Sequence, residues 1–448
     1  MKSQTYKQYK PSGIECLGEI PAHWEVIPIK RITSIPVTDG PHETPEFLDD
    51  GIPFISAEAI KNDKIDFSKK RGFISAVDHA RFSKKYKPQK GDVYIVKSGA
   101  TTGNVAYVAT VDEEFNIWSP LAVIRPHKRK AITPYVFFLM KSLYFFQSIE
   151  ISWSYGTQQN IGMNVIENLS IALPPLSEQL AIADFLDHET TRIDQLIAKK
   201  EQQIELLQEK RTALISHAVT KGLNPKAKRK DSRIAWLGEI PEHWRVCTFK
   251  RVANMSYGVG GELDRTLTKG IKILSLPNVG IDGTLMLDDI PYVDLADDQK
   301  PTLLLERGDL LFNWRNGSFK HLGKTAYFYL EGEYTHVSFL LRIRFNPEQH
   351  ESRYFQLLLN GFQNTGFFAS SKAGVNNTFN QSELENLWVM VPPIHEQKEI
   401  AHYLEKELSQ IDKLISKIAF SISKLHEYRI AIISAAVTGK IDVRKEAA

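Results

Sequence analysis

The chain contains two copies of one sequence pattern. The segment LGEIPAHWEVIPIKRI at 17–32 returns as LGEIPEHWRVCTFKRV at 237–252. Further along, LPPLSEQLAIADFLDHETTRIDQLI from Leu173 returns as VPPIHEQKEIAHYLEKELSQIDKLI from Val391. Shorter matches between these anchors keep the same order. Because self-similarity on this scale marks a duplicated structural unit, we expect two copies of one fold, each a globular domain followed by a helix.

The second repeated segment predicts a long helix in each copy. Apolar residues recur at the a and d positions of a heptad for about five repeats, which is typical of a two-helix coiled coil. Pro-Pro precedes each expected helix, and Gly222 or Gly439 lies near its end. The predicted seam consists of Ala183, Leu186, Thr190, Ile193, Ile197, Lys200, Ile204, Leu207, Arg211, Leu214 and Ala218 in the first copy and Ala401, Leu404, Leu408, Ile411, Ile415, Ile418, Ile422, Leu425, Arg429, Ile432 and Ala436 in the second.

The connection between the copies predicts the direction of the helices. The first helix ends near Gly222, and the second domain begins soon afterwards and leads directly into the second helix at Pro393. A domain of roughly 150 residues has a radius of gyration of about 15 Å, whereas a helix of roughly 45 residues is about 65 Å long. The end of the first helix must therefore lie near the start of the second. We expect antiparallel helices and an approximate two-fold axis between the copies.

These inferences give an α+β protein with two globular α/β domains separated by a long antiparallel two-helix coiled coil. The expected boundaries are 1–172 for the first domain, 173–222 for the first helix, 223–233 for a linker, 234–390 for the second domain, and 391–448 for the second helix and C-terminal tail.

Composition excludes several classes of protein. The chain has 448 residues, of which 42% are hydrophobic and 24% charged, so it can bury several cores. The segment MKSQTYKQYKPSG lacks the apolar stretch of a signal peptide, and no run reaches the roughly 18 apolar residues of a membrane span. We therefore expect a cytoplasmic protein with no membrane partner. Two cysteines cannot form a four-ligand metal site, and a net charge of +3 means that a polyanion must be bound by local patches.

Two similar but differing modules in inverted orientation suit duplex DNA. The DNA duplex has local two-fold axes perpendicular to its own axis, and protein geometry sets the separation of the half-sites. Because the two modules have diverged, we expect a bipartite and asymmetric target.

Two loops in each copy are candidate DNA contacts, because they combine Gly, hydroxyl and amide residues with a cation or an aromatic residue. They are 97–104 and 152–160 in the first copy and 313–318 and 370–378 in the second. Gln and Asn can pair with adenine, Arg with guanine, and hydroxyl groups or amides can hold phosphate. The alternative interpretation is that these loops are ordinary turns.

Base contacts are expected from Gln158, Gln159, Arg315, Asn376 and Asn377, and phosphate contacts from Lys97 and Lys372. The full predicted DNA-binding set is Lys97, Ser98, Thr101, Thr102, Asn104, Tyr155, Thr157, Gln158, Gln159, Asn160, Asn313, Trp314, Arg315, Asn316, Lys372, Asn376, Asn377 and Thr378. Trp24 and Trp244 occupy equivalent places in the two copies, so we expect them to be packing residues.

Over nearly its whole length the chain resembles the specificity subunits of type I restriction-modification enzymes. The resemblance rests on GEIPAHW at 18–24, LPPLSEQLAIADFLD at 173–187, RIDQLIAKK at 192–200 and AVTKGL at 218–223. The second copy departs from these motifs at His402 and at Gly439-Lys440. The resemblance implies two target-recognition domains, with the helices serving as spacer and as docking sites for other subunits.

In that family the specificity subunit is not itself catalytic. The resemblance implies a partner assembly of double-stranded DNA, two methylation subunits and two restriction subunits, which together form a DNA adenine methyltransferase and an ATP-dependent endonuclease. No cofactor or metal is expected on this chain, since S-adenosylmethionine, ATP and Mg would act through the partner subunits.

Motifs of the competing enzyme classes do not fit. An amino-methyltransferase needs Asn or Asp before Pro-Pro, but Leu173 and Val391 stand there. The sequence GSFKHLGKT at 317–325 has the wrong spacing for a phosphate-binding loop. The remaining alternatives are a coiled-coil scaffold or a stand-alone DNA-binding protein without restriction partners.

Overall fold

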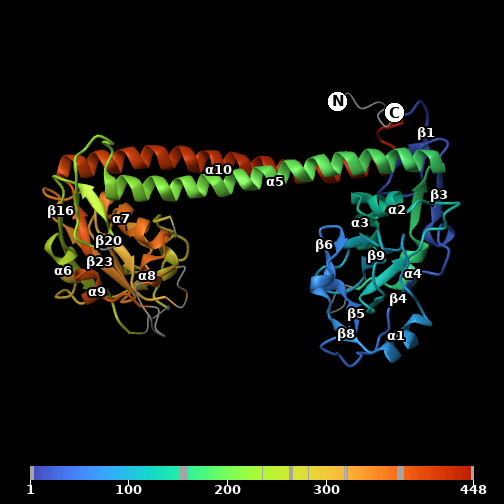
Figure 1. Ribbon diagram of the computed structural model, residues 1–448, viewed down its shortest axis with the longest axis horizontal. Helices are drawn as coiled ribbons and strands as arrows, with labels where there is room; N and C mark the ends of the chain where they lie inside the picture. The colour runs from blue at the N-terminus through green and yellow to red at the C-terminus, as the bar shows by residue number, and fades with distance from the viewer. Residues whose placement is uncertain are drawn as a thin grey trace. The chain divides into compact units, whose positions relative to one another are not determined.

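The chain has the expected mixture of long helices and small sheets. The computed structural model describes residues 5–151, 160–234, 236–261, 266–280, 282–316, 318, 321–370 and 378–444. The chain divides into two compact units, a first unit of Met1–Lys200 with Phe420–Ala448 and a second unit of Glu201–Ala419 (Figure 1). In the described part of the chain, every helix is too short or too polar to cross a lipid bilayer.

Two long helices contribute to both units. Helix α5 is Leu176–Lys221 and helix α10 is Ile394–Val437. Each follows the expected Pro-Pro pair, and each is followed by a glycine with positive φ, 72° at Gly222 and 71° at Gly439. A left-handed glycine after the last turn is a common helix terminator, because it lacks a Cβ that would clash. The predicted positions of both helices are confirmed.

The first unit contains a globular α/β domain. Its strands are β1 (Tyr9–Pro11), β2 (Glu19–Pro21), β3 (Glu25–Pro28), β4 (Thr38–Asp39), β5 (Ile52–Ile55), β6 (Ile60–Lys61), β7 (Lys64–Ile65), β8 (Gly72–Ile74), β9 (Val93–Val96), β10 (Val105–Tyr107), β11 (Asn116–Ile117), β12 (Leu121–Ile124) and β13 (Ser170–Leu173). Its shorter helices are α1 (Ala76–Ser83), α2 (Thr133–Met140), α3 (Leu143–Ile151) and α4 (Met163–Asn168).

The second unit contains a domain of the same kind. Its strands are β14 (Arg229–Asp231), β15 (Glu239–Pro241), β16 (Arg245–Thr248), β17 (Ala253–Tyr257), β18 (Ile271–Leu274), β19 (Tyr292–Val293), β20 (Leu310–Asn313), β21 (Thr325–Tyr327), β22 (Tyr334–His336), β23 (Leu340–Phe345) and β24 (Trp388–Val391). Its shorter helices are α6 (Lys300–Leu303), α7 (Ser352–Asn364), α8 (Phe367–Ser370) and α9 (Gln381–Glu385).

Sheet topology confirms that the two domains are copies of one fold. The four-stranded sheet has the order β10-β9-β12-β4 in the first unit and β21-β20-β23-β17 in the second, and every pairing in both is antiparallel. A three-stranded sheet, β11-β5-β8 or β22-β18-β19, contains one parallel pair at the same place in each unit. The duplication inferred from the sequence therefore extends through the stretches where the sequence match is thin.

Within each unit the two long helices run antiparallel, as the chain connection predicted. In the first unit Asp194 of α5 pairs with Arg429 of α10, and in the second unit Arg211 of α5 lies 3.5 Å from Asp412 of α10. The early part of one helix thus meets the late part of the other in both places. All the predicted a and d positions are buried or half-buried. The predicted two-fold axis and the separation of the two domains concern the placement of the units, and both stay predictions.

The core of each globular domain packs against the last turns of a long helix. The hydroxyl of Tyr135 donates to the carbonyl of Ala172 at 2.8 Å and lies 3.5 Å from the carbonyl of Val437 at the end of α10. In the second unit the hydroxyl of Tyr354 lies 3.1 Å from the carbonyl of Val219 near the end of α5. Helix ends are thereby fixed to the domain by both apolar packing and hydrogen bonds.

The expected linker at 223–233 contains a strand and is therefore shorter than the sequence suggested. Strand β14 lies inside it and pairs antiparallel with β15, as β1 pairs with β2 in the first unit. Strand β14 could not be recognised from the sequence because it contains the charged residues Arg229 and Lys230. A two-stranded ribbon at the surface does not require alternating apolar residues.

Candidate nucleic-acid interface

One predicted DNA-binding loop of each unit, 97–104 or 313–318, lies at one edge of the four-stranded sheet. Strands β4 and β9 are both antiparallel to β12, so their carboxyl ends lie at the same edge. Strands β17 and β20 are related to β23 in the same way. The loop at 97–104 follows β9, and the loop at 313–318 begins at the end of β20. We call these edges the first and second loop edges.

In each unit the structure joins the first predicted loop to the described last residue of the second. Ser98 forms an isolated antiparallel bridge with Asn160, and Arg315 forms one with Thr378. Two backbone hydrogen bonds extend these bridges, from the amide of Ile161 to the carbonyl of Lys97 at 2.8 Å and from the amide of Phe379 to the carbonyl of Trp314 at 2.7 Å. Segments more than fifty residues apart in sequence therefore meet at matching places in both copies, as shown by the residue numbers.

The first loop edge carries a tight hairpin between β9 and β10. The amide of Val96 donates to the carbonyl of Asn104, and the amide of Gly103 donates to the carbonyl of Val96, both at 2.8 Å. The hydroxyl of Thr102 donates to the carbonyl of Gly99 at 2.6 Å and so closes the turn. Thr101 and Asn104 are exposed. These two side chains are available to a ligand, whereas Thr102 is engaged within the loop.

Lys97 is held inside the first loop edge by Asp39. Its ammonium nitrogen lies 3.2 Å from a carboxylate oxygen of Asp39, and its side chain is 10% exposed. Lys85 and His42 also contact this carboxylate, at 2.5 and 3.1 Å. Burial alone would raise the pKa of Asp39, but hydrogen bonds from Lys85 and Lys97 outweigh it and hold the pKa below its usual value. Asp39 is therefore ionised near neutral pH and offsets part of the positive charge.

The same position in the second loop edge is occupied by aromatic residues. Trp314 stands where the first unit has Lys97, and Tyr257 stands where it has Asp39, as the strand registers show. The two rings are edge to face with centroids 5.3 Å apart, and the indole nitrogen of Trp314 donates to the carbonyl of Ser338 at 2.7 Å. An ion pair in one copy and an aromatic pair in the other thus fix the same two segments.

The two side-chain amides of the second loop edge have different surroundings. Asn313 is fully buried, and neither atom of its side-chain amide has a hydrogen-bond partner in the described part of the chain. The side-chain oxygen of Asn316 accepts from the amide of Ser318 at 3.1 Å. A base contact from Asn313 would require the loop to open. That contact stays a prediction.

Arg315 is an exposed cation of the second loop edge. Its guanidinium lies over the ring of Phe339, 5.6 Å from the centroid, and forms no ion pair with any residue that the structure describes. A guanidinium that is oriented but not neutralised can donate two parallel hydrogen bonds to guanine.

Several predicted site residues lie outside the described residues: Tyr155, Thr157, Gln158, Gln159, Lys372, Asn376 and Asn377. Their flanking positions are described, since Asn160 is exposed and Thr378 is half-buried. The predicted contacts of these seven residues stay predictions.

The repeated GEIPxHW motif has a structural role. His23 contacts Glu178 at 2.8 Å, and His243 contacts Glu396 at 2.7 Å, so each histidine meets an acid in the first turn of a long helix. Trp24 and Trp244 are fully buried, which confirms that they are packing residues. The matching motifs in the two copies therefore fix the first turns of α5 and α10.

Comparison with known proteins decides the family. The model of the type I restriction modification DNA specificity domain matches residues 21–206 and again residues 275–420. The chain belongs to this family. The first match includes the loop at 97–104 and the second includes the loop at 313–318, and each extends into the long helix that follows, in agreement with the resemblance drawn from the sequence motifs.

Known specificity subunits are similar over most of their length. The chain is 24% identical to the StySPI specificity subunit of Salmonella potsdam and 23% identical to the EcoKI specificity subunit of Escherichia coli K12, each over 95% of this chain and 90% of the relative. It is also 26% identical to the MjaVIII specificity subunit of Methanocaldococcus jannaschii, over 68% of this chain and 72% of the relative.

Solved structures share the fold. A chain from a structural study of complex assembly and conformational transition in a type I restriction-modification system matches with a TM-score of 0.71 and 17% identity, over 93% of this chain and 98% of the other. The HsdS subunit of Thermoanaerobacter tengcongensis matches with a TM-score of 0.55 and 17% identity, over 94% and 98%. The α+β specificity-subunit fold is thereby confirmed.

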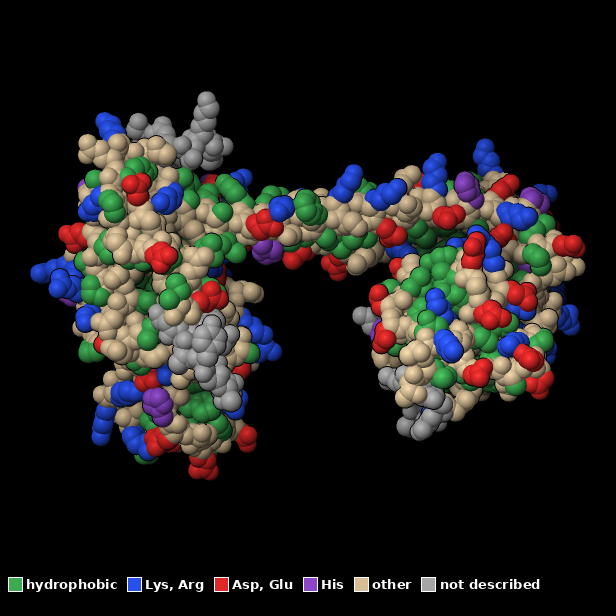
Figure 2. Space-filling view, turned by 180° about the vertical axis from the view of Figure 1, so that it is seen from behind, with side chains coloured by type: hydrophobic (Ala, Val, Ile, Leu, Met, Phe, Trp, Pro, Cys, Tyr) green, Lys and Arg blue, Asp and Glu red, His purple; other side chains and the backbone are tan. Residues whose placement is uncertain are grey.

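Charges on this specificity subunit are mixed. On the face shown in Figure 2, Lys and Arg side chains are interspersed with Asp and Glu. This agrees with the net charge of +3 and with the expectation that DNA is met by local groups. The basic segment SKKYK at 83–87 was a candidate phosphate contact from its sequence, and it contains Lys85, but sequence analysis missed Asp39, His42 and Phe339 as members of the loop edges. Their signal is weak because each comes from a segment far from the predicted loops.

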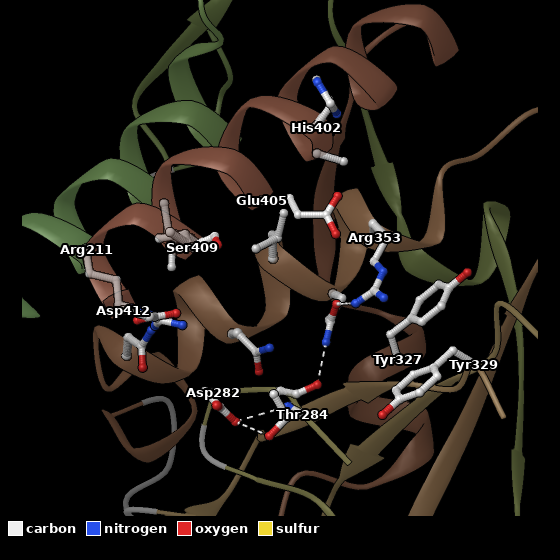
Figure 3. A pocket seen from close by; sticks show the side chains of 18 of the residues that line it. Arg211, Asp282, Thr284, Tyr327, Tyr329, Arg353, His402, Glu405, Ser409 and Asp412 are labelled. Carbon is white, nitrogen blue, oxygen red and sulfur yellow. Dashed lines mark hydrogen bonds and ion pairs between the residues drawn. The ribbon is translucent and has the colours of Figure 1, made fainter. Parts of the chain in front are cut away.

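A cavity of about 900 Å³ lies between the globular domain and the helices of the second unit. Arg211, Ser409 and Asp412 line it from the helices, and Asp282 and Thr284 line it from the domain (Figure 3). Arg353 stacks over Tyr327 at 3.7 Å inside it. No cluster of His, Cys, Asp and Glu suited to a metal ion occurs among the residues that the structure describes.

Proposed function

We propose that the chain is the sequence-specific DNA-binding subunit of a type I restriction-modification system, and that each unit binds one half of a bipartite, asymmetric target. One observation carries the proposal. The bridges Ser98–Asn160 and Arg315–Thr378 join two loop segments at the same place of the same fold, while the side chains around them differ between the copies. A shared frame with different contact residues suits a protein that must bind two different half-sites.

Each loop edge supplies a different set of DNA contacts in this proposal. In the second unit Arg315 donates to a guanine edge in the major groove. In the first unit the exposed Thr101 and Asn104 contact bases, and the half-exposed Lys85 contacts a phosphate beside them. Phosphate contacts position the domain, and base contacts select the sequence.

The subunit brings DNA to partner subunits in this proposal. The relatives named above are specificity subunits of type I restriction enzymes, which supports an assembly with two methylation subunits and two restriction subunits. The helices act as the spacer and as docking sites. Chemistry belongs to the partners, which use S-adenosylmethionine, ATP and Mg. The cytoplasmic location stays a prediction.

Sequencing that detects methylated adenines tests the function directly. Host DNA is compared with and without the gene for this chain, and we expect one bipartite motif to lose its methylation when the gene is removed. Exchanging residues 1–172 for the same region of a relative should replace one half of that motif and leave the other half unchanged. A methylation pattern that does not depend on the chain would favour a scaffold. Binding to the motif with no methylation anywhere would favour a stand-alone DNA-binding protein.

A further inference from the structure

Phe339 is an exposed aromatic residue at the second loop edge that no sequence motif identified. It lies in the turn between β22 and β23, where the amide of Leu340 donates to the carbonyl of Val337 at 3.0 Å. Leu340 is fully buried, whereas Phe339 is 43% exposed. A large apolar side chain in this position gains little from burial within its own domain. Burial in the domain core therefore does not explain why a phenylalanine stands at position 339.

The turn that carries Phe339 is fixed to the DNA-binding loop. The indole of Trp314 donates to the carbonyl of Ser338 at 2.7 Å, and the amide of Ser338 donates to the carbonyl of Val259 at 2.8 Å. Residue 339 is consequently held beside residue 315. The backbone of Ser338 is fixed from two sides, because its carbonyl accepts from Trp314 and its amide donates to Val259.

The backbone of Arg315 is fixed as well. It pairs with Thr378, and the carbonyl of the preceding Trp314 accepts from the amide of Phe379 at 2.7 Å. The remaining freedom lies in the long side chain of Arg315, whose guanidinium rests over the Phe339 ring at 5.6 Å. Ordering such a side chain costs conformational entropy, and contact with a ring reduces the number of positions that it can adopt.

Two other arginines of the second unit, Arg344 and Arg342, are held by oxygen acceptors and not by a ring. The guanidinium of Arg344 is bonded to Asp309 at 2.7 Å, and that of Arg342 donates to the carbonyl of Thr302 at 2.7 Å. A carboxylate or carbonyl uses the donors of a guanidinium, whereas an aromatic face orients the group and leaves its N–H edges free. Among these three, Arg315 alone combines exposure with free donors in the described part of the chain.

We propose that Phe339 is a positioning residue for DNA recognition, which orients the guanidinium of Arg315 toward one guanine of the second unit's half-site. The inference rests on the proposed function. The equivalent positions of the first unit are Pro120 and Ser98, as the strand registers show. They provide neither an aromatic ring nor a cation, so we expect this arrangement for one half-site only.

The test uses the full chain in complex with its own methylation subunits. Binding is measured by competition on DNA duplexes in which each position of the target is changed in turn. The variants are Phe339→Ala, Phe339→Tyr, Arg315→Ala and Arg315→Lys. Trp388→Ala is the matched control, because Trp388 is also an exposed aromatic residue of the second unit, at 45%, but belongs to the separate β16-β24 sheet.

We expect Phe339→Ala to reduce discrimination at one guanine by about two- to five-fold, the size of an exposed cation–π contact. Phe339→Tyr should retain discrimination, and Arg315→Ala and Arg315→Lys should lose more of it at the same guanine. The other half-site should be unaffected in all variants, and Trp388→Ala should match the parent chain.

Three outcomes overturn the proposal. They are unchanged discrimination in Phe339→Ala, an equal loss of affinity for every sequence, or a loss at a position different from that of Arg315→Ala. An equal loss would make the ring or the guanidinium a backbone contact. If the parent complex itself shows no sequence preference, the proposed function fails instead, so the two failures are distinguishable.

Discussion

Arg429 of α10 joins Asp194 of α5 to Asp63 of the first globular domain. Its guanidinium donates to Asp194 at 2.9 and 3.2 Å and to Asp63 at 2.8 Å, and Lys141 pairs with the same Asp63 carboxylate. Asp63 stands in the turn between β6 and β7 with a positive φ of 68°. The network ties this hairpin to both long helices, and burial lowers the pKa of Lys141 within it.

Replacing Arg429 should destabilise the first unit. Arg429→Ala leaves Asp63 and Asp194 without the guanidinium that they share, and we expect a loss of about 1–3 kcal/mol in the free energy of unfolding, measured with urea. Lys424→Ala is the control, since Lys424 and its partner Glu427 are both more than half exposed and should contribute little. Equal effects of the two substitutions would contradict the role given to the network.

His336 should make the second unit sensitive to acid. Burial lowers its pKa from 6.5 to about 3, and the charge of Arg342 adds to the effect. Because the pKa is lower in the folded than in the unfolded state, the folded state is penalised as pH falls from about 6.5 towards 3. The expected loss is roughly 2 kcal/mol at about pH 5.

His336→Ile provides the measurement, because Ile117 occupies the equivalent place in the first unit. The free energy of unfolding of the second unit is measured with urea at about pH 7.5 and about pH 5, on either side of the unperturbed histidine pKa. The difference between the two free energies should be smaller in the variant than in the parent chain. An identical difference would show that other groups cause the acid sensitivity.

Gly439 should tolerate no side chain. It has a φ of 71°, and a Cβ would lie 2.3 Å from Cδ of Pro21. Gly439→Ala therefore combines left-handed strain with overlap, at a cost of about 2–4 kcal/mol. Gly238→Ala isolates the strain, since Gly238 has a φ of 65° and nothing within 4 Å of its Cβ position. Thermal unfolding should rank the parent chain above Gly238→Ala and that variant above Gly439→Ala.

Lys85 should strengthen binding to any DNA sequence. We expect Lys85→Ala to weaken binding uniformly and to reduce the slope of log affinity against log salt by about 0.9, the value for one phosphate contact. Asp39 keeps Lys97 as a partner in this variant, so the loop is expected to stay in place. A change confined to one base position would instead make Lys85 a base contact.

Helix length should set the gap between the half-sites. Inserting four residues near the middle of both α5 and α10 adds about one turn, or ~5.4 Å. At ~3.4 Å per base pair the preferred gap should grow by one or two pairs. Methylation sequencing of cells that carry the variant measures the gap directly, and an unchanged gap would refute the spacer model.

Both helices and the duplication were predictable because their signals are local and periodic. The heptad of α5 and α10 repeats within each segment, so the buried stripe through Ile193 and Ile411 follows from spacing alone. The match between the copies predicted equivalent domains, and the sheet orders confirm it. Sequence reasoning also predicted correctly that Trp24 and Trp244 are packing residues. Residues that are identical in two otherwise divergent copies contribute to the fold that the copies have in common.

Side-chain partners at the loop edges were decided by the tertiary structure. The same backbone position holds Lys97 against Asp39 in one unit and Trp314 against Tyr257 in the other, and Phe339 reaches Arg315 from a different strand connection. By itself the sequence determined the repeated frame, because periodicity along the chain specifies which face of a helix is buried. Only the folded sheet decided the neighbours at its edge, because those residues come from separate strands that hydrogen bonding brings together.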